Sequence, residues 1–103
     1  MIWAIDFDGT IVDLAYPEIG KPNTKLIYRL KQLKEKGHKL ILWTCREGKD
    51  LEEAVDFCNS VNLFFDAINQ NLPGITYAWE GRKVFADVYL DDKNISIKEF
   101  LDG

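Results

Sequence analysis

The stretch IWAIDFDGT, residues 2–10, decides the fold class of this 103-residue chain. Residues 2–7 are apolar except for Asp6, as expected of a short strand that is buried on both faces of a sheet. Asp8 and Gly9 follow directly, and a glycine at this position allows the chain to turn. The stretch therefore predicts a central strand that delivers two carboxylates to one edge of a sheet.

The rest of the chain predicts strands and helices in alternation. Three further apolar segments are expected to form strands: residues 38–44, 63–68 and 84–90. Three segments with helical spacing of apolar residues are expected to form helices: residues 22–36, 50–61 and 96–101. Asp50 and Glu53 form the expected cap pair of the middle helix. This pattern predicts an α/β fold, a Rossmann-like three-layer sandwich with helices on both faces of a short parallel sheet of about four strands in the order 3-2-1-4.

Length and composition limit the classes of protein to consider. The chain suffices for a single domain over residues 1–103, because a domain usually needs about 100 residues. Its 17 acidic and 13 basic residues offer no broad cationic surface for nucleic acid or anionic lipid. Cys45 and Cys58 lack the spacing of a zinc site or a disulfide scaffold. With no apolar run of about 20 residues and no signal-like start, we expect a cytoplasmic protein without a membrane partner.

Polar residues gather where the predicted strands end. Ligands of parallel sheets bind beyond the carboxyl ends of the strands. In strand order, those ends carry Asp6 and Asp8, then Thr44, Cys45 and Arg46, then Asn69, and finally Asp91 and Asp92. Carboxylates at this density repel one another unless a cation lies among them, and hard oxygen ligands suit magnesium. Carboxylates, a hydroxyl and cations at one edge are the components of a phosphoryl-transfer site.

These residues also resemble a known family. The segment Asp6-Phe7-Asp8-Gly9-Thr10, Thr44 at the end of an apolar strand, and Asp91-Asp92 after another strand resemble motifs one, two and four of the haloacid dehalogenase superfamily. The order of the motifs agrees, and the resemblance covers essentially the whole chain. It implies a magnesium-dependent phosphatase that acts on a small phosphorylated substrate.

The resemblance also implies a role for each matched residue. Asp6 would be the nucleophile that becomes an aspartyl-phosphate, and Asp8 would be the general acid and base. Gly9 would direct a backbone N–H at the phosphoryl oxygens, and Thr44 would donate a hydrogen bond to them. The implied Mg²⁺ ligands are Asp6, the main-chain carbonyl of Asp8, and Asp91, with Asp92 beside the metal or next to its ligands.

The cation that the family places at motif three is left open by the sequence. Lys83 is the candidate by resemblance, but a fully extended strand over residues 84–90 would place it about 25 Å from Asp91, at about 3.3 Å per residue. Lys21 and Arg46 are the substitutes. Arg46 has a second interpretation, a surface charge paired with a nearby glutamate, Glu47 or Glu53.

Three alternatives to a phosphatase follow from the same residues. The acceptor of the phosphoryl group could be other than water, as in a phosphotransferase or phosphomutase. A non-catalytic phosphate-binding module is disfavoured, because the acidic cluster is costly to hold together without a use. A response-regulator receiver is rejected, because that fold needs an aspartate after its third strand.

Substrate choice is expected to lie outside a cap domain. About 14 residues separate Asp8 from the first predicted helix and about 14 separate Ile68 from Lys83, far fewer than the roughly 50 that a domain needs. Recognition is then expected from the short loops, or from a second copy of the chain in a homo-oligomer through Tyr77 and Trp79.

Overall fold

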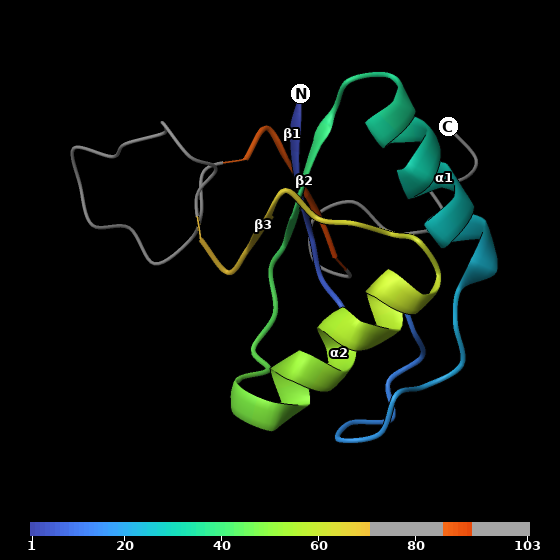
Figure 1. Ribbon diagram of the computed structural model, residues 1–103, viewed down its shortest axis with the longest axis vertical. Helices are drawn as coiled ribbons and strands as arrows, with labels where there is room; N and C mark the ends of the chain where they lie inside the picture. The colour runs from blue at the N-terminus through green and yellow to red at the C-terminus, as the bar shows by residue number, and fades with distance from the viewer. Residues whose placement is uncertain (71–85, 92–103) are drawn as a thin grey trace.

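Four parallel strands form the centre of the fold in a computed structural model that describes residues 1–70 and 86–91. The strands are β1 (Ile2–Ile5), β2 (Lys39–Leu42), β3 (Ala67–Ile68) and β4 (Val88–Leu90). They are arranged in the order β3-β2-β1-β4 (Figure 1), which confirms the predicted order 3-2-1-4. In the register of this sheet, Ile5 pairs with Leu42 on one side and with Leu90 on the other. The residues that follow these three therefore emerge together at one edge.

Within the described residues two helices connect the strands, with small shifts from their predicted bounds. Helix α1 (Thr24–Glu35) begins after Asn23, whose side chain accepts a hydrogen bond from the Leu26 N–H at 3.2 Å. Helix α2 (Gly48–Ser60) begins two residues before the predicted start, and its N-cap residue Glu47 makes no side-chain cap bond. The predicted cap pair of Asp50 and Glu53 is therefore wrong, because Asp50 already lies inside the first turn.

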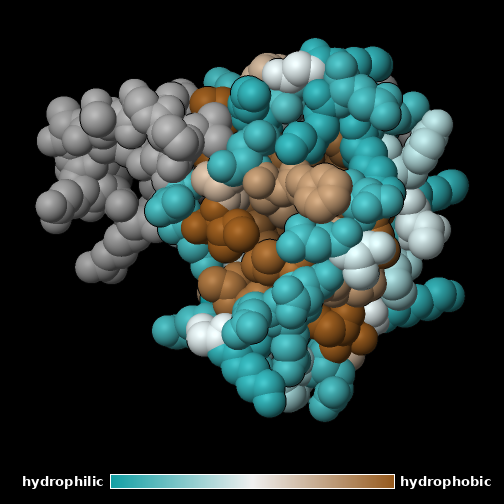
Figure 2. Space-filling view, viewed as in Figure 1, coloured by the Kyte–Doolittle hydropathy of each residue, from teal (hydrophilic) through white to brown (hydrophobic). Residues whose placement is uncertain are grey.

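Both helices pack on the same face of the sheet. The larger apolar core joins residues of α1 and α2 to alternate strand positions, among them Ile5, Leu42 and Leu90. Figure 2 shows apolar atoms between the two helices on this face. The other face presents a smaller buried cluster of Ala4, Ile41 and Ala67. The helix predicted at residues 96–101 lies outside the described residues. No described helix has the length and apolar character needed to cross a bilayer.

The two outer strands are shorter than predicted. β3 covers only the end of the predicted segment 63–68, because Asp66 bonds to the first part of β2 through its side chain. Its carboxylate accepts from the Leu40 N–H at 2.8 Å, and its own N–H donates to the Leu40 carbonyl. Phe64, inside the predicted strand, is 51% exposed and lies in the connection. β4 begins at Val88, whereas the prediction began it at residue 84, which lies outside the described part of the chain.

Candidate active site

Three carboxylates meet at the edge where β1 and β4 end. Asp6 and Asp91 each follow one member of the pair Ile5–Leu90, and the Asp6 N–H donates to the Leu90 carbonyl at 3.2 Å. Asp6 is partly buried, and its desolvation raises the pKa of its carboxyl group from 3.8 to about 6. The negative charges of Asp8 and Asp91 act in the same direction. The structure thus brings together Asp6, Asp8 and Asp91, and among residues 1–70 and 86–91 no cation forms an ion pair with Asp6.

This shift predicts how the stability of the metal-free protein depends on pH. Between pH 3.8 and about 6 the folded chain keeps a proton on Asp6 that the unfolded chain releases, so stability falls as pH rises through this window. Asp6→Asn removes the effect. Because each pKa unit is worth about 1.4 kcal/mol and water screens a partly exposed group, we expect the variant to be about 1–2 kcal/mol more stable at pH 8.

The measurement is urea unfolding in chelator at pH 4 and pH 8, for the wild type and for Asp6→Asn. The difference in free energy of unfolding between Asp6→Asn and the wild type should be small at pH 4 and larger at pH 8. A variant that is less stable than the wild type at pH 8 would contradict the raised pKa of Asp6.

Arg46 holds the carboxylate of Asp8. Its Nε and Nη2 each donate to a different Asp8 oxygen at 2.8 Å, a bidentate ion pair. The other N–H groups of the guanidinium donate to the carbonyls of Pro17, Glu18 and Asp50, at 2.9–3.2 Å. Arg46 is 3% exposed, and the bonds to Asp8 raise the pKa of its guanidinium. Its five N–H groups are therefore all used inside the protein.

The prediction of Arg46 as a surface charge paired with a nearby glutamate is wrong for a physical reason. A buried guanidinium needs an acceptor for each N–H, and the loop before α1 supplies two carbonyls while Asp8 supplies the countercharge. As a phosphate-binding residue, Arg46 would have to give up one of these bonds. In the described arrangement it positions Asp8.

Two aromatic rings enclose the guanidinium. Its Cζ lies 5.2 Å from the centre of the Phe7 ring and 5.0 Å from the centre of the Tyr16 ring. The Tyr16 hydroxyl donates to the Asp50 carboxylate at 2.8 Å, and this bond raises the pKa of Tyr16. The loop returns tightly, since a Cβ at Gly20 would collide with the Asp13 carbonyl. Sequence reasoning missed the roles of Tyr16 and Asp50, because residues 34 positions apart carry no local signal of their contact.

Thr44 and Asn69 shape the end of β2. The Thr44 N–H donates to the side-chain oxygen of Asn69 at 2.8 Å, and Asn69 has a positive φ of 52°. The Thr44 hydroxyl oxygen accepts from the Arg46 N–H at 3.1 Å, which leaves its hydrogen to donate elsewhere. Hydrogen bonds with Asn69 and Arg46 thus fix Thr44 at the predicted edge of the sheet, and the Thr44 hydroxyl can still donate to a phosphoryl oxygen.

The other residues predicted for the site differ in where the structure places them. Gly9 has φ +80°, a conformation that favours glycine, and its N–H donates to the Val12 carbonyl at 2.8 Å. The structure uses this amide in the turn, and its contact with a phosphoryl group stays a prediction. Lys21 is exposed, and its ammonium forms no ion pair with the described residues. Lys83 and Asp92 lie outside the described residues. Thr10, whose hydroxyl donates to Asp6 at 3.4 Å, is buried at 2% exposure and joins the site through the DFDGT motif.

The donor set fits magnesium in type. Within residues 1–70 and 86–91, no group of three His, Cys, Asp or Glu side chains could hold a metal by itself. The ligand set implied by the resemblance needs only two carboxylate side chains, from Asp6 and Asp91, because its third ligand is the main-chain carbonyl of Asp8. All are hard oxygen donors. Desolvation is the main cause of the raised pKa of Asp6, and the charges of Asp8 and Asp91, which raise it further, are ones that a divalent cation would offset.

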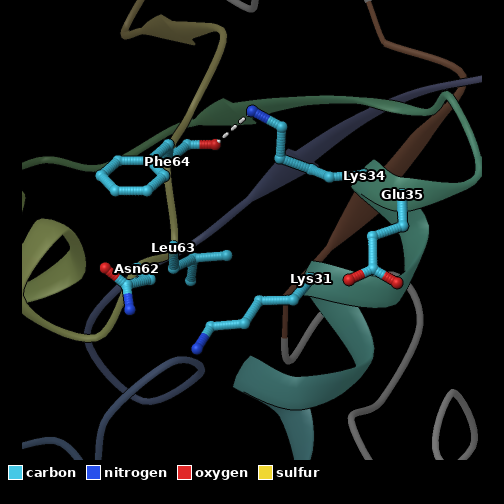
Figure 3. A pocket seen from close by; sticks show the side chains of 6 residues that line it. All are labelled: Lys31, Lys34, Glu35, Asn62, Leu63 and Phe64. Carbon is cyan, nitrogen blue, oxygen red and sulfur yellow. Dashed lines mark hydrogen bonds between the residues drawn. The ribbon is translucent and has the colours of Figure 1, made fainter.

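Described residues line a depression at each of two opposite edges of the sheet. One, of about 450 Å³, is lined by Asp8, Leu14, Tyr16, Cys45 and Arg46. The other, of about 330 Å³, lies between the ends of α1 and α2, beside the starts of β2 and β3 (Figure 3). There Lys34 donates to the Phe64 carbonyl at 2.7 Å (Figure 3). Only the first adjoins the carboxylates.

Comparisons with known proteins agree with this geometry. No curated protein matches the chain. A solved structure of a conserved protein from Bacteroides thetaiotaomicron is similar, with 42% sequence identity and a TM-score of 0.82 over 92% of this chain and 78% of the other. The family of haloacid dehalogenase-like hydrolases matches residues 3–97. With a motif-bearing strand at its centre, a parallel sheet and a match of this extent, the chain belongs to the haloacid dehalogenase-like hydrolases.

Proposed function

We propose that this hydrolase is a magnesium-dependent phosphatase that cleaves phosphate monoesters through an aspartyl-phosphate on Asp6. The observation that carries the proposal is the division of labour between two aspartates. Asp6 lies beside Asp91 and is partly desolvated, whereas Asp8 is held by a buried arginine. One carboxylate is thus suited to meet a metal and phosphorus, and the other to handle a proton.

The first half of the reaction forms the covalent intermediate. A carboxylate oxygen of Asp6 attacks phosphorus, and the bond between phosphorus and the leaving oxygen breaks. Asp8 gives its proton to that oxygen, so a neutral alcohol departs. Each Asp8 oxygen keeps a second lone pair beside its bond to Arg46, and this is where Asp8 would carry the proton. While the proton is there the carboxyl group is neutral, so its bonds to Arg46 are weaker. The Thr44 hydroxyl donates to a phosphoryl oxygen.

The second half restores the enzyme. Asp8 takes a proton from water, the water oxygen attacks phosphorus, and the bond to Asp6 breaks to release phosphate. Asp6, Asp91 and the Asp8 carbonyl would hold the metal. When bound, magnesium would offset the negative charge of the carboxylates and of the phosphoryl oxygens, and would help to position the phosphoryl group for attack.

The test is metal dependence. Hydrolysis of p-nitrophenyl phosphate should fall at least roughly 100-fold in chelator and return with magnesium, since positioning and charge neutralisation supply most of the catalysis. Calcium should support it poorly, because its looser coordination disturbs the in-line geometry. A circular dichroism spectrum unchanged by chelator is the control for folding. Full activity in chelator would contradict the proposal.

A further inference from the structure

The depression beside Asp8 has the size of a small-molecule site. Its volume of about 450 Å³ falls among pockets that hold small ligands, about 300–1,000 Å³. Of its lining residues, Arg46 is buried and Asp8 is partly buried, whereas Leu14 and Tyr16 are 76% and 55% exposed. Two large apolar side chains thus stand open to solvent next to the proposed acid and base.

The polar groups of the depression already have partners. The Tyr16 hydroxyl donates to Asp50, and the five N–H groups of Arg46 donate to Asp8 and to main-chain carbonyls. Beside Asp8, which the proposed reaction uses for proton transfer, a ligand meets the Leu14 side chain, the Tyr16 ring and the sulfur of Cys45. A leaving group rich in hydroxyls or charges would lose water here and gain few hydrogen bonds in return.

The position of the depression indicates which part of a substrate would bind in it. In phosphoryl transfer the attacking and leaving oxygens lie on opposite sides of phosphorus. Asp8, which protonates the leaving oxygen, lines the depression, and Asp6, which attacks, does not. The group attached to the leaving oxygen therefore extends into the depression.

We propose that this depression binds the leaving group, and that the preferred substrates are phosphate monoesters of neutral aromatic alcohols. The inference rests on the proposed phosphatase function. Tyr16 is held before a ligand arrives, by its bond to Asp50 and by the guanidinium 5.0 Å from its ring. A fixed ring offers stacking area at little entropic cost, and a bound aromatic group would cover Leu14 as well.

Kinetics with two esters test the proposal. Leu14→Ala should raise the KM for 2-naphthyl phosphate roughly 5–10-fold and change kcat less than about two-fold, because it removes ground-state apolar contact. The KM for methyl phosphate, which does not reach Leu14, should stay the same. Tyr28→Ala, at a tyrosine that is 65% exposed on α1, is the matched control and should change neither. Equal changes in KM for both esters would overturn the proposal.

A second measurement needs no turnover. Cys45 lines the depression and is exposed, whereas Cys58 is buried, so iodoacetamide should alkylate Cys45. Saturating 2-naphthol should slow this alkylation at least roughly 5-fold in the wild type, and Leu14→Ala should need more 2-naphthol for the same protection. Protection in a protein without phosphatase activity would support the depression and reject the proposed function. Activity without protection would reject the depression alone.

Discussion

Asp6→Asn is expected to lower kcat/KM for every phosphate ester at least roughly 10⁴-fold, because an amide in place of the nucleophilic carboxylate cannot form the acyl phosphate. The loss should be the same for good and poor leaving groups, since no substrate chemistry replaces the missing bond to phosphorus. Steady-state assays with p-nitrophenyl phosphate and with an alkyl phosphate at saturating magnesium measure it.

A neighbouring substitution provides the control. Asp13→Asn changes an exposed carboxylate in the loop before α1, outside the site, and should keep turnover within about two-fold of the wild type, as surface changes usually do. Residual activity of Asp6→Asn within ten-fold of the wild type would show that another group attacks phosphorus.

Arg46→Met is expected to lower the free energy of unfolding by about 3 kcal/mol, or the Tm by roughly 10–20 °C, because it leaves the Asp8 carboxylate without its ion-pair partner and removes the guanidinium bonds to three carbonyls. Hydrolysis of alkyl phosphates should fall roughly 100-fold with it, since Asp8 loses its orientation. Hydrolysis of p-nitrophenyl phosphate should fall less, because its leaving oxygen needs little protonation.

A double-mutant cycle distinguishes the effect of losing the Asp8–Arg46 ion pair from the effect of losing the packing of the Arg46 side chain. If the unpaired carboxylate causes the instability, Asp8→Asn should restore part of the stability lost in Arg46→Met, and the two effects should not add. Lys49→Met, at an exposed cation on α2, is the control and should change the Tm little. Strict additivity of Asp8→Asn and Arg46→Met would contradict the role assigned to Arg46.

The sequence predicted the parts of the fold whose cause is local. The apolar run around Ile5, the spacing of apolar residues in α1, and the alternation of strands with helices suffice for a parallel sheet in the order 3-2-1-4. The edge that holds Asp6, Asp8 and Asp91 follows from that order alone, because parallel strands end on the same side.

The parts that failed depend on contacts across the chain. Arg46 and Asp8 are 38 residues apart, and the glutamates closer in sequence, Glu47 and Glu53, form no ion pair with Arg46. Asp66 shortens β3 by a side-chain bond to β2, which no apolar pattern reveals. The backbone bond from Gly9 to Val12 depends on the fold of the loop and could not be predicted from the motif, whereas the role of that amide at the phosphoryl group stays a prediction.

The most direct test of the account is the fate of the phosphoryl group in the two aspartate variants. Each variant is mixed briefly with labelled p-nitrophenyl phosphate and magnesium, quenched in acid, and assayed for protein-bound phosphate. Asp8→Asn should carry up to about one label per chain, because Asp6 can displace a good leaving group and no base then activates water. Asp6→Asn should carry none. Label on Asp6→Asn, or rapid multiple turnover by Asp8→Asn, would contradict the assignment of nucleophile and acid.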